Sequence, residues 1–215
     1  LGVSALEVSH RSAWFTHVIH EAEANLRELL DVPTNYRVVF CQGGATLQFS
    51  MVAMTFLRGT DRVADYVVTG SWGSKAVKEA EQEGVIRTAW TGKEDGFRRA
   101  PDNDELAAVL APDAAFVHVT ANETIQGVEF PSTPVVPSGV DLVCDMSSDF
   151  LSRPIDVARY GFIYAGAQKN AGPAGVTIAI IREDLLERIP DGLPIMLDYR
   201  TYTEHGSLYN TPPVL

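Results

Sequence analysis

The sequence predicts an α/β protein with a mostly parallel central sheet flanked by helices. Strand-like and helix-like segments alternate along the chain, a pattern that is typical of parallel sheets with helical crossovers. Several of the strand-like segments, such as residues 140–144 and 176–181, are apolar runs that look like buried strands. Glycine and polar residues gather in the loops that follow strands, and folds of this class place their functional groups there.

Each element has its own signal in the sequence. Ser12 is placed as the N-cap of a long helix whose apolar residues are spaced helically from Phe15 to Leu30. Further helices are expected at residues 45–57, 74–83, 104–110 and 182–189. Strands are expected at residues 36–41, 64–69, 85–89, 114–120, 140–144, 160–164 and 176–181. Residues 131–137, with three prolines, form a rigid connector, and no domain boundary is indicated within residues 1–215.

Composition and charge exclude several classes of protein. Hydrophobic residues make up 46% of the 215 residues and charged residues 21%, which excludes disorder and fibrous repeats. The net charge of -11 repels phosphate backbones and anionic lipids, so we expect neither a nucleic-acid nor a membrane partner. No apolar run is long enough to span a bilayer, and residues 1–11 show no signal peptide.

The cysteines and histidines indicate no metal site. Cys41 and Cys144 lie in apolar runs, which is typical of buried, reduced thiols in a cytoplasmic protein. His17 and His20 are one helical turn apart but match no zinc signature, so they are interpreted as a solvated helix face.

Residues 43–46 (Gly-Gly-Ala-Thr) join a predicted strand to a predicted helix. Glycines let the backbone approach a ligand closely, and a helix N-terminus offers N–H groups to an anion such as phosphate. The segment is neither a Walker A loop nor a complete Gly-x-Gly-x-x-Gly motif. A tight strand–helix turn without a ligand therefore explains these residues as well.

Asp145 ends the buried strand 140–144, and Lys169 follows 24 residues later in a loop of small residues. Pyridoxal-phosphate chemistry needs a lysine that forms a Schiff base and an aspartate that holds the pyridinium nitrogen. On spacing alone, a lysine and an aspartate on unrelated loops remain the alternative. Trp72, between Ser71 and Gly73, could stack on a planar ring or belong to the core.

Several segments together resemble the phosphoserine aminotransferase family, whose members are pyridoxal-phosphate enzymes of fold type I. The resemblance spans nearly the whole chain in the same order and is strongest around Asp145 and Lys169. It rests on Ser9-His-Arg-Ser12, Gln42-Gly-Gly-Ala-Thr-Leu-Gln-Phe49, Gly70-Ser-Trp72, Asn122-Glu-Thr124, Asp145-Met-Ser-Ser-Asp-Phe-Leu-Ser-Arg-Pro154, Tyr164-Ala-Gly-Ala-Gln-Lys-Asn170 and Ser207-Leu-Tyr-Asn-Thr-Pro-Pro213.

The resemblance implies a cofactor, pyridoxal 5'-phosphate, and a role for each matching residue. Lys169 would carry the cofactor and shuttle the proton, and Asp145 would pair with the ring nitrogen. Trp72 would stack on the ring, and Thr124 would bind its phenolic oxygen. The cofactor phosphate would be bound by the backbone of Ala45 and Thr46, by Gln168, and by Asn210 and Thr211 of a neighbouring subunit.

The resemblance also implies the reaction and the assembly. The reaction would be reversible transamination of 3-phosphohydroxypyruvate with glutamate, giving O-phosphoserine and 2-oxoglutarate, in serine biosynthesis. His10 and Arg11 would bind the anionic end of the substrate, and two subunits would share each cofactor site as a homodimer.

The sequence also departs from the family pattern. Thr46 stands where some members carry an arginine, so phosphate binding would depend more on backbone N–H groups. Family chains begin earlier and continue past Leu215 into a small C-terminal domain that holds the carboxylate-binding arginine. We therefore expect residues 1–215 to form the cofactor-binding large domain, with the C-terminal domain largely absent. Two alternatives stay open: another fold type I enzyme, such as an alanine–glyoxylate transaminase or cysteine desulfurase, and a non-catalytic dimerising fragment.

Overall fold

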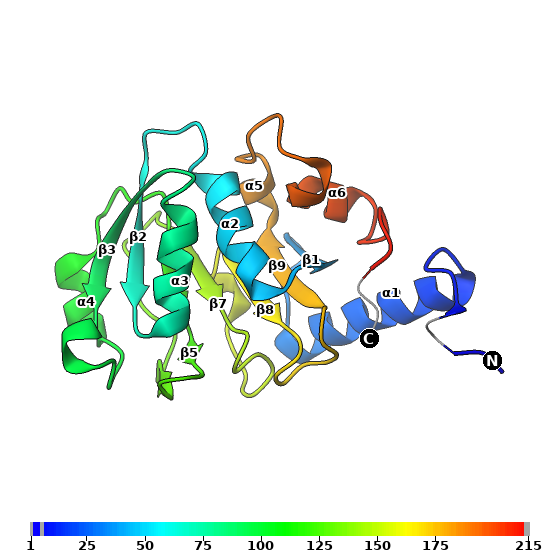
Figure 1. Ribbon diagram of the computed structural model, residues 1–215, viewed down its shortest axis with the longest axis horizontal. Helices are drawn as coiled ribbons and strands as arrows, with labels where there is room; N and C mark the ends of the chain where they lie inside the picture. The colour runs from blue at the N-terminus through cyan, green and yellow to red at the C-terminus, as the bar shows by residue number, and fades with distance from the viewer. Residues whose placement is uncertain (1, 5–6, 213–215) are drawn as a thin grey trace.

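The computed structural model describes residues 2–4 and 7–212 and confirms the α/β prediction. Seven strands form one sheet in the order β1-β9-β8-β7-β4-β2-β3 (Figure 1). Strand β9 is antiparallel to both of its neighbours, and the other neighbouring pairs of the sheet are parallel. The strands are β1 (Tyr36–Cys41), β2 (Val63–Val68), β3 (Val85–Thr91), β4 (Val117–Thr120), β7 (Leu142–Asp145), β8 (Phe162–Gly166) and β9 (Thr177–Arg182). A separate hairpin pairs β5 (Asn122–Glu123) with β6 (Val128–Glu129).

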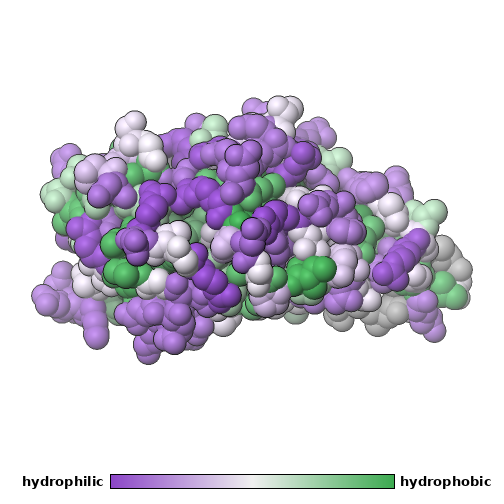
Figure 2. Space-filling model, turned by 90° about the horizontal axis from the view of Figure 1, so that it is seen from above, coloured by the Kyte–Doolittle hydropathy of each residue, from purple (hydrophilic) through white to green (hydrophobic). Residues whose placement is uncertain are grey.

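Helices cover both faces of the sheet, because its central strands bury side chains on both sides. One hydrophobic cluster includes Phe49 of α2, Ala76 of α3 and Tyr199 of α6, and the opposite cluster includes Leu26 of α1 and Leu106 of α4. The helices are α1 (Ala13–Leu30), α2 (Gly44–Phe56), α3 (Ser71–Ala80), α4 (Asn103–Val109), α5 (Glu183–Leu186) and α6 (Tyr199–Glu204), with short 3-10 turns at Lys93–Asp95, Val157–Arg159 and Ile195–Leu197. Seen from above, the surface is mainly hydrophilic with scattered hydrophobic residues (Figure 2).

Several predicted boundaries are wrong. Helix α3 begins at Ser71, three residues before the predicted start, because its N-terminus is capped by a distant side chain that the local sequence does not reveal. The strand predicted at residues 114–120 is shorter in the structure, where β4 spans Val117–Thr120. The predicted helix 182–189 shrinks to Glu183–Leu186, because Arg182 still pairs with Tyr36 in the sheet. The hairpin β5–β6 and helix α6 were not predicted.

Other local predictions are confirmed. The Ser12 hydroxyl accepts a hydrogen bond from the Phe15 backbone N–H (3.2 Å) and caps α1. Cys41 and Cys144 are free and buried.

A separate finding concerns the helices. Within residues 2–4 and 7–212, none of them is long and apolar enough to cross a membrane.

A buried carboxylate joins β2 to its surroundings. Asp65 accepts two hydrogen bonds from the Arg87 guanidinium (2.8 and 2.6 Å) and one from the Ala111 backbone N–H (2.7 Å). Asp65→Ala leaves these donors unpaired, so we expect the free energy of unfolding to fall by about 3 kcal/mol in urea denaturation. The exposed Asp113→Ala is the control and should change it by less than about 0.5 kcal/mol. Equal effects of the two substitutions would contradict this prediction.

Candidate active site

A pocket opens at the edge of the sheet where the parallel strands β4 and β7 end. Asp145, the last residue of β7, lies between Thr120 of β4 and Tyr164 of β8 in the strand register. The pocket has a volume of about 110 Å³. It is lined by Gly44, Ala45, Thr46, Trp72, Thr120, Asn122, Asp145, Ser147, Ser148, Gln168 and Lys169. The fold thus brings residues from five loops that follow strands, at residues 42–46, 70–74, 120–124, 145–149 and 166–173, to one place.

Asp145 is buried, and one of its two carboxylate oxygens is free. Oδ1 accepts hydrogen bonds from the Ser147 backbone N–H (2.9 Å) and hydroxyl (2.6 Å). Within the described part of the chain, Oδ2 accepts no hydrogen bond. Burial raises the pKa of Asp145, while the hydrogen bonds from Ser147 and the charge of Lys169 oppose that shift. A cationic N–H in the pocket would satisfy Oδ2 and keep the carboxylate ionised.

Lys169 lies on the loop that connects β8 to β9. Its ammonium donates to the hydroxyls of Thr124 (2.5 Å) and Ser148 (3.2 Å), which are also hydrogen-bonded to each other. Nζ lies 5.3 Å from the centre of the Trp72 ring. Two hydroxyls and an aromatic face therefore hold this amine at the pocket that Asp145 also lines.

Trp72 lies in the first turn of α3 rather than in a turn before the helix. Its half-buried indole lines the pocket, and its Nε1 is buried with no hydrogen-bond partner in the described part of the chain. Lys75, one turn further along α3, places its Nζ 4.1 Å from the centre of the same ring. An aromatic face at this position can cover a planar ligand.

The N-terminus of α2 forms another wall of the pocket. Gly43 and Gly44 both have positive φ angles (87° and 66°), and a Cβ on Gly43 would lie 2.4 Å from Leu47 Cδ2. Glycine is therefore required at residue 43. No side chain caps this end of α2, so the backbone N–H groups of Ala45 and Thr46 are available to an anion.

Buried aromatic residues support the pocket from below. His118 of β4 stacks on Tyr66 of β2, with ring centres 4.8 Å apart, and its Nε2 is hydrogen-bonded to the Tyr164 hydroxyl (2.8 Å). Burial lowers the pKa of His118 to about 3 and raises that of Tyr164. The imidazole is therefore neutral and adds no charge beneath Asp145.

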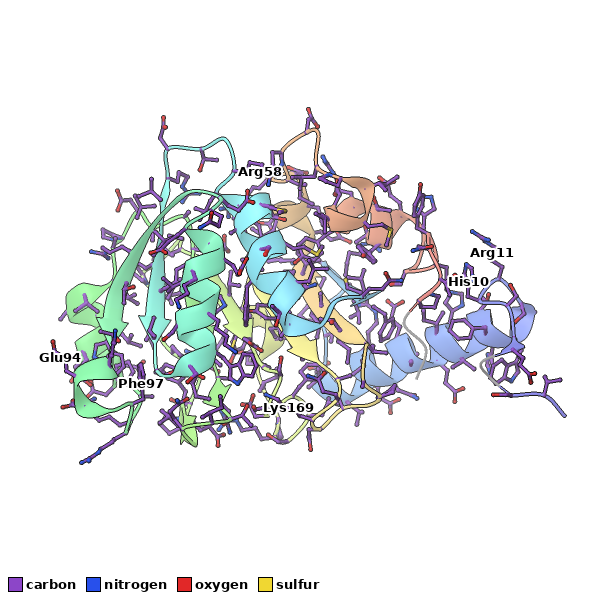
Figure 3. All side chains as sticks on the ribbon, in the orientation of Figure 1. His10, Arg11, Arg58, Glu94, Phe97 and Lys169 are labelled. Atoms are coloured by element: carbon purple, nitrogen blue, oxygen red, sulfur yellow. The ribbon has the colours of Figure 1, made fainter. Side chains whose placement is uncertain are left out.

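The structure does not bring all of the predicted residues together. Ala45, Thr46, Trp72, Asp145, Gln168 and Lys169 line the pocket, and Thr124 contacts Lys169. His10 and Arg11 lie at the end of α1 that is remote from Lys169 (Figure 3). Asn210 and Thr211 are exposed and do not line the pocket, and the Thr211 carbonyl accepts a hydrogen bond from Gln42. These four residues therefore lie away from the pocket of the described chain.

Sequence reasoning missed several residues that shape this site. Ser147 orients Asp145, Ser148 holds Lys169, and Glu123 binds the start of α3. Thr120 lines the pocket with a buried hydroxyl that has no partner in the described ranges. The signal for Ser147 was its position two residues after a strand-end aspartate, a spacing that favours a local side-chain to backbone bond. Within residues 2–4 and 7–212, no three His, Cys, Asp or Glu side chains are placed to hold a metal ion.

A mostly parallel sheet flanked by helices, with this pocket where its parallel strands end, defines an α/β protein. The family model for class-V aminotransferases matches residues 2–215, and the chain belongs to that family.

Its similarity to individual proteins is more specific. It is 56% identical over 212 residues to a curated phosphoserine aminotransferase from Laribacter hongkongensis, covering 99% of this chain and 58% of that protein. The phosphoserine aminotransferase structure from Bacillus circulans subsp. alkalophilus matches with a TM-score of 0.92 and 49% identity, over 99% of this chain and 58% of that one. A pyridoxal-phosphate-bound phosphoserine aminotransferase from Trichomonas vaginalis matches with a TM-score of 0.88 and 40% identity, over 99% of this chain and 59% of that one.

Proposed function

We propose that this chain is the cofactor-binding domain of a pyridoxal-phosphate-dependent phosphoserine aminotransferase. The proposed reaction is the reversible transamination of 3-phosphohydroxypyruvate with glutamate, and we propose that it serves serine biosynthesis in the cytoplasm. The observation that carries the proposal is that one pocket holds both Lys169 and the buried Asp145, whose Oδ2 accepts no hydrogen bond in the described part of the chain. The similarity to phosphoserine aminotransferases over 99% of the chain supports the choice of substrate.

The chemistry of the pocket residues fits pyridoxal phosphate. Asp145 is a buried residue that lines the pocket, and its Oδ2 accepts no hydrogen bond in the described chain, which suits the protonated nitrogen of a pyridine ring. The uncapped N-terminus of α2 suits a phosphate, and the Trp72 indole suits the face of the ring. When bound, the cofactor supplies an electron sink for the bond broken at the substrate carbon.

This chain's own residues would do the rest. Asp145 would hold the proton on the ring nitrogen, and Ser147 would keep the carboxylate oriented. Lys169, held by Thr124 and Ser148, would form the covalent link and then move a proton between substrate and cofactor carbons. Gln168 and the backbone of Ala45 and Thr46 would bind the cofactor phosphate.

The chain spans 58% of the length of the curated relative from Laribacter hongkongensis. We therefore propose that the complete protein contains a further domain, which supplies the group that binds the substrate α-carboxylate and closes over the pocket. The transamination activity belongs to that complete protein, so activity and cofactor binding are to be measured on the complete protein.

The function is tested by a visible spectrum and an assay of amino donors. The purified protein should absorb near the wavelengths of protein-bound pyridoxal phosphate and should transfer the amino group of glutamate to 3-phosphohydroxypyruvate. A preference for alanine with glyoxylate, or release of sulfur from cysteine, would indicate another fold type I enzyme. A protein that binds no pyridoxal phosphate would instead be a dimerising domain without catalysis.

Each pocket is further proposed to be completed by a second copy of the chain in a homodimer. His10, Arg11, Asn210 and Thr211 lie outside the pocket of their own subunit, so a partner subunit is the natural recipient of these residues. A net charge of -11 gives an anionic substrate no general attraction, and Arg11 would provide the local cation.

Arg11→Ala should therefore raise the KM for 3-phosphohydroxypyruvate about tenfold to a hundredfold, as expected when a charge-assisted bond is lost. The affinity for pyridoxal phosphate should be unchanged, and titration of the cofactor measures it. Equal losses for substrate and cofactor would point to a folding defect and contradict the assignment.

Mixed dimers test which subunit Arg11 serves. Arg11→Ala and Lys169→Ala chains are each impaired, but a mixed dimer contains one pocket with an intact Lys169 and an intact partner Arg11. Activity should therefore return when the two variants are combined. No recovery in verified mixed dimers would show that Arg11 acts within its own subunit.

A further inference from the structure

Glu123 is a fully buried carboxylate to which the proposed function assigns no role. It lies on the hairpin β5–β6, next to Thr124, and its exposed fraction is 0%. A buried carboxylate is costly unless its oxygens accept hydrogen bonds, so its partners show what it does. Those partners are the backbone N–H groups of Trp72 (2.8 Å) and Gly73 (2.7 Å).

These two bonds replace the cap that α3 lacks. No side chain of α3 or of the N-cap residue Gly70 caps this helix, and the Glu123 carboxylate binds one N–H of the first turn with each oxygen. A negative charge at a helix N-terminus is also favoured by the helix dipole. Gln126, from the same hairpin, accepts from the Ser71 backbone N–H (3.1 Å) and donates to the Ser71 hydroxyl (2.7 Å).

Gly70, which lies against Glu123, is consistent with the contact between Glu123 and the start of α3. A Cβ on Gly70 would lie 2.6 Å from the Glu123 carboxyl carbon and 2.6 Å from Gln126 Oε1. The φ angle of Gly70 is 178°, which any residue adopts, so the requirement for glycine comes from the close approach of Glu123. Burial raises the pKa of Glu123, and the two backbone N–H groups oppose that shift.

We propose that Glu123 is a positioning residue that fixes the Trp72 indole at the pocket by holding the first turn of α3. The same carboxylate closes the N-terminus of α3 to other anions, whereas the N-terminus of α2 stays open. The phosphate of a ligand is thereby directed to α2 and the planar ring to Trp72. This inference rests on the proposed function only for the identity of the ligand.

A double-mutant cycle tests whether Glu123 acts through Trp72. Glu123→Gln keeps the shape but turns an NH2 group toward a backbone N–H, so we expect pyridoxal phosphate to bind about tenfold more weakly. Trp72→Ala should weaken binding as well, and adding Glu123→Gln to it should cause almost no further loss. Fully additive losses would overturn the proposal. Glu79→Gln, the same change at the other end of α3, is the control and should leave the affinity unchanged.

A second measurement needs no cofactor. With every other tryptophan of the complete protein, Trp14 and Trp90 among them, replaced by phenylalanine, the fluorescence of Trp72 reports the position of its ring. Glu123→Gln should make this fluorescence more readily quenched by acrylamide, and unchanged quenching would overturn the proposal. If Glu123→Gln does not fold, as judged by circular dichroism, Gln126→Met is measured instead, because it removes the bonds from the same hairpin to Ser71. It should also make the Trp72 fluorescence more readily quenched by acrylamide, and unchanged quenching would overturn the proposal. If the wild-type protein binds no pyridoxal phosphate, the proposed function fails, but the quenching result still decides the role of Glu123.

Discussion

Lys169→Ala should lower transamination by about 10⁴-fold, because a proton-transferring residue contributes up to this much to the rate. The side chain lies at the pocket, held by Thr124 and Ser148, and no other lysine lines it in the described chain. The assay follows 2-oxoglutarate formed from glutamate and 3-phosphohydroxypyruvate.

Lys75 offers a matched control. Its Nζ is closer to the Trp72 ring than that of Lys169 (4.1 against 5.3 Å), but Lys75 does not line the pocket. Lys75→Ala should keep turnover within a few-fold of the wild type. Borohydride reduction followed by peptide mapping should place the pyridoxyl group on Lys169. A label on Lys75, or substantial turnover in Lys169→Ala, would refute the assignment of the covalent site.

Asp145→Asn should lower turnover by about a hundredfold to a thousandfold while pyridoxal phosphate still binds. An amide cannot hold a proton on the ring nitrogen by charge, and loss of one such electrostatic contact raises a barrier by roughly 3–4 kcal/mol. Single-turnover rates with glutamate measure the effect directly.

Asp149→Asn is the control for this substitution. Asp149 lies four residues further on and is also largely buried, and burial raises its pKa to about 6, but it does not line the pocket. Turnover in Asp149→Asn should stay within a few-fold of the wild type. Equal losses in the two variants would mean that the ring nitrogen is not held by Asp145.

Local signals in the sequence predicted much of the fold. The boundaries of β1 were predicted exactly as observed because a β-rich run is bounded by Asn35 and Gln42-Gly43. The Ser12 cap was predicted because its partner, Phe15, is three residues away. The start of α3 was missed because its cap, Glu123, is about fifty residues distant and no local pattern reveals it. The reversed direction of β9 also depends on pairing between distant strands, which apolar runs do not encode.

The residues of the candidate site also divide into those with a local signal in the sequence and those whose role depends on contacts between distant residues. Asp145, Trp72 and Lys169 were predicted because strand-end loops converge on one edge of a parallel sheet. The positions of His10 and Arg11 relative to the pocket could not be predicted, since they depend on the direction in which α1 leaves the sheet. The hydroxyls of Ser147 and Ser148 were not singled out because serine is common in loops, and only their contacts with Asp145 and Lys169 distinguish them.

The reversed strand β9 has a consequence for the order in which the protein folds. Because β8 and β9 are antiparallel neighbours joined by one loop, their pairing closes only a short stretch of chain, and such contacts form quickly. The other edge of β9 pairs with β1, which lies near the opposite end of the sequence, so this pairing closes a long loop and forms late. We therefore expect the loop that carries Lys169 to be shaped early, and the N-terminus of α2, which follows β1, to reach it only when the sheet is complete. A folding intermediate would therefore already present the amine but would lack the anion-binding wall, so tight cofactor binding would mark the completed sheet.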